Sequence, residues 1–382
     1  MRRGTAAAVA ATTVLGATVA AVAAGRYAAD AALRPSADRR APAGFDGPEL
    51  TVHSIASGRI ALTRTLASRL PGVYGLTGRG CHAVVGEVLD GEHHAATAAT
   101  ADTVVRRLVR ITHGELAPGT RVRLTPQVYI GNPRDALDLS CAEVEVPSEL
   151  GPLPAWLVPG SRDTWVITVH GLGTTREQPL VILPFLYRHQ LPTLDIAYRG
   201  DAGAPRAPDG VGHLGDSEWR DLDAAMRYAI GSGAQRIVLH GWSTGASMAL
   251  HAAARSARRG HIAGLVLDSP VLDWRATLRS LAARRVPGAL VPLAVRAAQG
   301  RAGLHAERLA EVADPTRLRA PALLLHGPDD TIAPWEASRA FAGERPELIT
   351  LHTVHRAPHA AMWNADPNGY EEALRRFLTP LM

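Results

Sequence analysis

The chain of 382 residues contains no lysine, so arginine fills all 41 of its Lys and Arg positions. The arginines are scattered, and they form no cluster interleaved with aromatic residues of the kind that nucleic-acid-binding surfaces carry. Because alanine, glycine and proline are abundant, the replacement of lysine by arginine indicates a GC-rich genome. We therefore expect no nucleic-acid partner, despite the formal net charge of +5.

Cysteine is also scarce, and Cys81 and Cys141 are the two cysteines of the chain. No Cys-x-x-Cys motif is present, which argues against the common structural zinc sites. The two residues fit either a disulfide in an exported protein or a pair of reduced thiols, and the sequence leaves both open.

Charge is missing from residues 5–24, a stretch long enough to span a bilayer as a helix. Arg2 and Arg3 precede it, and the small residues at 21–23 fit a cleavage site. Residues 1–29 are therefore predicted to be a signal peptide or an N-terminal hydrophobic helix that anchors the protein in a membrane, and residues 30–49 a linker. The protein would then be membrane-anchored or exported, and arginines on both sides of the stretch leave its orientation open.

Two modules are predicted after the linker. Residues 50–154 carry short runs of β-forming residues at 103–105, 121–124 and 127–130, separated by glycine, proline and asparagine, and so indicate a small β-rich module of unassigned role. From residue 155 to 382 apolar strands alternate with amphipathic helices, which predicts an α/β fold with a mainly parallel sheet covered on both faces. The predicted strands are 164–170, 191–198, 236–240, 262–268, 321–326 and 348–354, and the predicted helices are 177–189, 216–230, 245–258, 334–343 and 367–378. Such a sheet binds its ligands at the carboxyl ends of the strands.

A Gly-x-Ser-x-Gly motif at residues 241–245 lies between a predicted strand and a predicted helix. Gly241 and Gly245 would let neighbouring backbone pass close to a sharp turn that presents the hydroxyl of Ser243 outward. The flanking strand and helix favour Ser243 as a nucleophile over a glycine-rich turn with an idle serine.

A nucleophilic serine needs a carboxylate and a histidine, which follow it in that order in this kind of fold. Asp330 comes directly after the predicted strand that ends at His326, and we predict that Asp330 is the acid. Asp329 is its competitor and otherwise a turn residue, and Asp273, after the preceding strand, is a further candidate.

Three histidines, His352, His355 and His359, compete for the role of the base near the last predicted strand. We favour His359, which ends the loop after that strand, with His355 second. A metal site formed by the three is disfavoured because Pro358 breaks the helix that would place the last two on one face.

The sequence His170-Gly171-Leu172 ends the first strand of the module. Because Gly171 lets backbone amides point into the site, the N–H groups of Leu172 and Thr244 are the predicted oxyanion donors. The alternative for Leu172 is an ordinary glycine turn.

Over roughly its last 225 residues the chain resembles the α/β-hydrolase superfamily, closest to bacterial exported or membrane-anchored members related to carboxylesterases and serine peptidases. The motifs that carry the resemblance are His170-Gly171, the serine motif at 241–245, His326-Gly327 with Asp330 and Pro334, and His359 with Trp363 and Asn364. The resemblance implies a Ser243–His359–Asp330 triad, an acyl-enzyme intermediate and no cofactor or metal. Thr244 departs from the residues often found there, which alters the pocket wall but keeps the backbone donor.

Residues 271–314 are predicted to form a helical cap, whose leucine and alanine content suits an acyl substrate or simple core packing. The favoured function is hydrolysis of a carboxylic ester or thioester, ahead of a peptide bond. Acyl transfer to another acceptor would use the same residues, and a non-catalytic membrane-anchored binding protein would share only the fold. A small-molecule or acyl substrate is the expected partner, with membrane association through residues 5–24.

Overall fold

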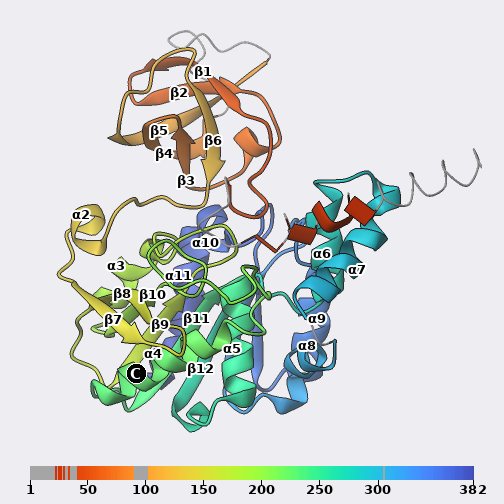
Figure 1. The fold of residues 1–382 in the computed structure, drawn as a ribbon. Helices are drawn as coiled ribbons and strands as arrows, with labels where there is room; N and C mark the ends of the chain where they lie inside the picture. Colours follow the sequence, from red (N-terminus) through yellow and green to blue (C-terminus); the bar gives the residue numbers. More distant parts are fainter. Residues whose placement is uncertain are drawn as a thin grey trace, which may run out of the picture.

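The structure, a computed structural model, describes residues 41–89, 102–303 and 306–382, together with residues 22–23, 25–27, 29–30 and 33–34 (Figure 1). Most of the predicted targeting segment, residues 5–24, therefore lies outside the described residues. Within the described ranges, no helix combines the length and the apolarity that crossing a bilayer requires.

The first module is a closed barrel of six strands with the spatial order β1-β2-β5-β4-β3-β6. Its strands are β1 (Leu50–Ala56), β2 (Arg59–Thr63), β3 (Tyr74–Gly78), β4 (Cys81–Val88), β5 (Thr103–His113) and β6 (Arg121–Thr125). The fully buried guanidinium of Arg106 donates to four backbone carbonyls, those of Ser68, Leu70, Gly72 and Gly86. These bonds satisfy the buried charge without a carboxylate and hold the 68–72 loop against the barrel.

The predicted strand at 127–130 does not form, and the chain there leaves the barrel as a connection without regular structure. Its polar groups bond to side chains of both modules instead of pairing with the backbone of a neighbouring strand, and the carbonyls of Gln127 and Val128 contact His82 and Arg110 of the barrel. The amide of Gln127 donates to Thr175 and to Glu177, and Gly131 N–H donates to Glu177 at 2.7 Å. A run of β-forming residues is not sufficient for a strand when no strand edge is available to pair with it.

The second module is an eight-stranded sheet with the order β14-β13-β12-β11-β9-β10-β8-β7. Its strands are β7 (Ala142–Pro147), β8 (Pro152–Val158), β9 (Thr164–Val169), β10 (Thr193–Ile196), β11 (Arg236–Trp242), β12 (Ile262–Asp268), β13 (Ala322–His326) and β14 (Ile349–Thr353). Strands β9 to β14 are parallel, whereas β7 and β8 pair antiparallel at one edge. The sheet thus begins at residue 142, ahead of the predicted boundary at 155.

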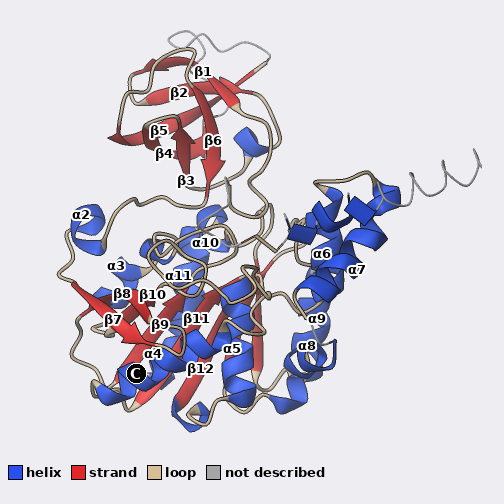
Figure 2. Ribbon diagram, in the orientation of Figure 1, coloured by secondary structure: helices blue, strands red, loops and turns tan. Residues whose placement is uncertain are grey.

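Helices cover both faces of this sheet (Figure 2). Side chains of α4 (Trp219–Gly231), α5 (Thr244–Arg255) and α9 (Trp335–Glu344) pack into one apolar core, and those of α3 (Leu183–Arg188) and α11 (Pro367–Leu378) into the other. The remaining helices are α2 (Pro133–Leu137), α10 (Met362–Ala365) and the cap helices α6 (Trp274–Ala283), α7 (Val291–Arg301) and α8 (Ala306–Val312). Single 3-10 turns lie at Ala67–Arg69, Pro179–Val181, Arg259–His261, Gly288–Leu290, Pro315–Arg317 and Thr379–Leu381.

The barrel rests on the loop and helix that follow β14 (Figure 1). Asn364 joins the two modules, because its carbonyl accepts from Val73 N–H and its side-chain amide donates to the carbonyls of Val73 and Pro126. Ala361 packs into the barrel core. Cys81 in the barrel and Cys141 before β7 are both free thiols.

Candidate active site

Ser243 lies at the turn between β11 and α5, with φ 50° and ψ −112°. These left-handed backbone angles are strained for a serine and present its side chain at the carboxyl end of the sheet. The glycines of the motif are required sterically. A Cβ on Gly241 would lie 2.3 Å from backbone atoms of Gly245, and a Cβ on Gly245 would lie 2.2 Å from the carbonyl oxygen of Val169.

The structure brings His359 to Ser243 from a loop 116 residues further along the chain, with 2.6 Å between Nε2 and Oγ. The two competing histidines lie elsewhere: His352 is half-buried on β14, and the side chain of His355 is exposed. Of the three, His359 is therefore the one placed to remove a proton from Ser243. Among the described residues no group of three or more His, Cys, Asp or Glu side chains could hold a metal ion.

Asp330 lies in the loop after β13 and completes the row, with 2.7 Å between its Oδ2 and Nδ1 of His359. The same oxygen accepts from Nε2 of His326 at 2.9 Å, and Oδ1 accepts from the backbone N–H groups of Ile332 and Ala333. Burial alone would raise the pKa of this carboxyl, but the charges and hydrogen bonds of His359 and His326 hold it well below its ordinary value.

The other two acid candidates have structural roles. Asp329 is exposed and accepts the backbone N–H of Arg356, and Asp273 caps the N-terminus of α6 by accepting from Ala276 N–H.

An ionised Asp330 fixes the proton on Nδ1 of His359, because a carboxylate can only accept a hydrogen bond. Nε2 of the same ring is then unprotonated and accepts from the hydroxyl of Ser243. This is the arrangement in which a histidine removes a serine proton.

The predicted oxyanion loop passes directly beside the nucleophile, since a Cβ on Gly171 would lie 3.1 Å from Cβ of Ser243. Thr244 begins α5, where the backbone N–H groups have no partner within the helix. Nε2 of His170 pairs with Asp201 at 2.7 Å, and the backbone N–H of Thr174 donates to the carbonyl of Gly171 at 3.3 Å. These contacts fix the course of the loop that carries the N–H of Leu172.

Gln178, which no sequence motif indicated, links the oxyanion loop to the histidine loop. Its buried Oε1 accepts from the N–H of Gly171 at 2.8 Å and from the hydroxyl of Thr174, and its Nε2 donates to the carbonyl of Ala360 at 2.9 Å. Ser269 supports the same loop, because its hydroxyl oxygen accepts from the N–H of Ala360 at 3.0 Å. Gln178 is therefore a positioning residue for both the base and the oxyanion donors.

Replacement of Gln178 by methionine is expected to lower kcat by about 10- to 100-fold and to change KM little, because misplaced oxyanion donors weaken binding of the transition state. Steady-state kinetics on a p-nitrophenyl ester measures the effect. Gln235→Met, at an exposed glutamine on the surface, is the matched control and should behave like the unmodified protein. An equal loss in both variants, or a change confined to KM, would contradict the positioning role.

Two family models and several solved structures match parts of this chain. Residues 194–377 match the model of the prolyl oligopeptidase family, and residues 51–125 match a domain of unknown function (DUF8805). The Pyrococcus furiosus esterase Pf2001 superposes with a TM-score of 0.54 at 22% identity, covering 66% of this chain and 94% of the esterase. Another crystal form of the same esterase gives 0.52 at 20% identity, covering 66% and 96%.

Residues 142–382 have the α/β-hydrolase fold. The family match within this domain supports a serine hydrolase, and the superposed esterase establishes the fold. A search of curated proteins found no match. The barrel that precedes this domain lies outside the prolyl oligopeptidase match, so that match carries no information on the role of the barrel.

Proposed function

We propose that this protein is a serine hydrolase that cleaves a carboxylic ester through an acyl-enzyme intermediate. The observation that carries the proposal is the continuous row from Ser243 to His359 to Asp330, with hydrogen bonds of 2.6 and 2.7 Å. Such a row, on a strained turn beside a glycine-flanked loop, activates a hydroxyl that is otherwise a poor nucleophile.

In the proposed reaction Oγ of Ser243 attacks the ester carbonyl carbon while Nε2 of His359 takes the hydroxyl proton. The N–H groups of Leu172 and Thr244 stabilise the negative oxygen of the tetrahedral intermediate. His359 then returns the proton to the departing alcohol, which leaves an ester between the acyl group and Ser243. Water, deprotonated by His359, releases the acid and restores the serine. Asp330 holds the imidazole and stabilises its charged form.

Two observations favour an ester over an amide. The superposed structure is an esterase, and the apolar side chains around Leu172 suit an acyl group. The match to a peptidase family favours a second candidate, cleavage of a peptide bond. Both candidates use the same triad, so they differ in the leaving group that the site accepts.

A fluorophosphonate probe tests the nucleophile, and p-nitrophenyl esters compared with aminoacyl anilides test the substrate class. We expect the folded protein to be labelled at Ser243, a Ser243→Ala variant to remain unlabelled, and the esters to be cleaved faster than the anilides. Failure of the folded protein to label would end the proposal. Faster cleavage of anilides would replace the esterase with a peptidase.

A further inference from the structure

A short segment of the chain, residues 41–47 and called the strap below, crosses the candidate active site on its way to the barrel. The backbone N–H of Ala43 donates to the carbonyl of Leu172 at 3.2 Å. A Cβ on Gly44 would lie 3.2 Å from Cβ of His359 and 3.8 Å from Cγ1 of Ile332. The strap therefore lies on both the base and the oxyanion loop.

The position of the strap leaves the catalytic side chains covered. Ser243 has 2% of its surface exposed and His359 has 1%. A substrate carbonyl must reach Oγ of Ser243 from the side opposite the protein core. The strap contacts two of the residues that border this approach, His359 and Leu172.

The space beneath the cap is apolar and is partly filled by the chain's own N-terminal segment. Three side chains of that segment, those of Ala29, Leu33 and Ala43, are buried in one apolar cluster with Leu172 and Ile332. The same cluster contains side chains of the cap and its base, namely Val271, Trp274 and Leu278. Figure 1 shows the described N-terminal pieces of this segment, in red, beside the cap helices α6 and α7. Apolar side chains of the N-terminal segment thus share one cluster with Leu172 of the oxyanion loop.

Surface contacts hold the strap in this position. Asp46 forms an ion pair with Arg284 at the end of α6 and lies 4.0 Å from Arg285. Phe45 packs against Tyr74 of the barrel, with 6.2 Å between the ring centroids. Gly44 has φ +87°, a left-handed angle that glycine adopts without strain and that makes a hinge beside His359. The strap is therefore held by the cap at one point and by the barrel at another.

We propose that the strap is an autoinhibitory cover on the catalytic serine and that the group which displaces it is an apolar acyl chain of the substrate. This inference rests on the proposed function, and it adds the substrate class and a means of regulation. An apolar chain restores the contacts that Ala43 and its neighbours lose when the strap moves, whereas a short or polar acyl group leaves the cluster in water. Each added methylene of the acyl chain is expected to raise kcat/KM by up to about 3-fold until the site is full.

The ion pair gives the sharpest test, because it lies outside the triad. Asp46→Arg and Arg284→Glu each place like charges together at the cap, and each is expected to raise the rate of fluorophosphonate labelling and kcat/KM for p-nitrophenyl octanoate by about 5-fold. The double variant recreates the pair with the charges exchanged and should return towards the unmodified rates. Rising NaCl should increase the activity of the unmodified protein, because salt screens the partly exposed pair.

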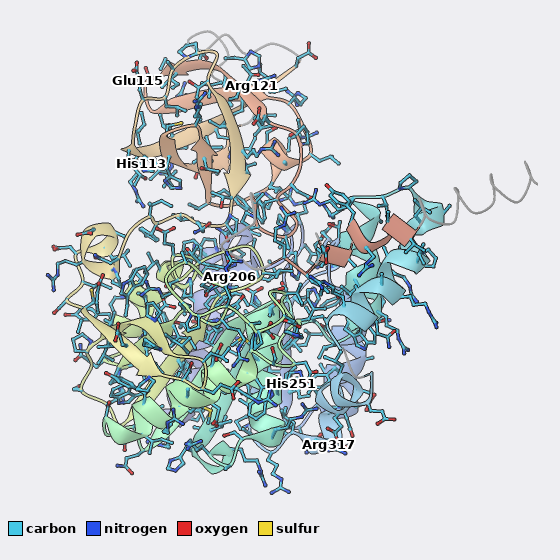
Figure 3. All side chains as sticks on the ribbon, in the orientation of Figure 1. His113, Glu115, Arg121, Arg206, His251 and Arg317 are labelled. Atoms are coloured by element: carbon cyan, nitrogen blue, oxygen red, sulfur yellow. The ribbon has the colours of Figure 1, made fainter. Side chains whose placement is uncertain are left out.

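Glu49→Ala is the matched control for these variants. Glu49 lies three residues beyond Asp46 and pairs with Arg121 and Arg123 of the barrel rather than with the cap. Arg121 is labelled on the barrel in Figure 3. Removal of this carboxylate should leave both rates unchanged, and circular dichroism with thermal unfolding confirms that each variant is folded.

The outcomes separate this inference from the proposed function. If the unmodified protein labels as fast as the folded Asp46 and Arg284 variants, the strap does not cover Ser243 and the inference fails while the hydrolase stands. If acetate and octanoate esters are cleaved equally well by all variants, the proposal that an apolar acyl chain displaces the strap is wrong. If every folded variant, including the unmodified protein, fails to label, the proposed hydrolase itself has failed.

Discussion

Replacement of Ser243 by alanine is expected to lower kcat for an ester substrate by at least about 10⁵-fold while leaving the fold intact. The substitution removes the nucleophile. Among the described residues, no second hydroxyl forms a hydrogen bond with the ring of His359. Residual turnover would come from the oxyanion donors and substrate binding alone. The measurement is the ratio of kcat between the unmodified protein and the purified variant, on the p-nitrophenyl ester that the unmodified protein cleaves fastest.

The histidine provides a second arm of this prediction. His359→Ala should cause a loss of similar size, and the Ser243→Ala/His359→Ala double variant should be no worse than either single one, because the two side chains act as one unit. His355→Ala is the matched control, since His355 lies in the same loop and is exposed. Additive losses in the double variant, or a large loss at His355, would show that the row through His359 is not the reactive one.

The residues of the proposed triad were predicted from local patterns in the sequence. The serine motif lies between a strand and a helix that are contiguous with it, and Asp330 directly follows a strand of five buried residues. Within such segments the spacing of apolar residues indicates whether a strand or a helix forms, because that spacing reflects which side chains become buried. Parallel strands then bring their carboxyl ends to one edge, so three distant side chains meet.

What sequence patterns missed depends on contacts between distant segments. Gln178 is a polar residue in a turn, and its role comes from Ala360, which lies 182 residues further along the chain. The strap lies in a stretch that lacks an apolar period, and its position follows from single contacts with Leu172 and His359. Strand β7 and the first three residues of β8 lie within residues 50–154, the range predicted for the first module, because a β-rich stretch does not reveal which sheet it will join.

Replacement of the buried Asp195 by asparagine is expected to remove part of the loss of stability that the raised pKa values of two buried carboxyls predict between pH 5 and pH 8. Asp195 lies on β10, fully buried, and neither carboxylate oxygen makes a hydrogen bond of ordinary geometry with a described residue. Burial raises the pKa of this carboxyl to about 8, against the smaller opposing effects of Thr168 and Arg176.

The direction of the pH effect follows from the raised pKa. In the unfolded chain Asp195 ionises near pH 4, whereas in the folded protein it keeps its proton until about pH 8. The folded state therefore binds more protons across this window, and its stability falls as the pH rises through it. Across the three pH units of this window, a difference of one bound proton corresponds to at most about 4 kcal/mol in the free energy of unfolding.

Urea unfolding at pH 5 and at pH 8 measures this difference. The asparagine variant has no charge to bury, so its free energy of unfolding should change less between the two pH values, and at pH 8 it should exceed that of the unmodified protein. Burial also raises the pKa of Asp268 to about 8, so the variant keeps a loss of similar size from that residue. Asp163→Asn, at an exposed carboxylate paired with Arg236, should shift stability by no more than about 0.5 kcal/mol. Equal pH dependence in the Asp195 variant and the unmodified protein would mean that Asp195 is ionised in the folded state and stabilised by groups that these contacts do not include.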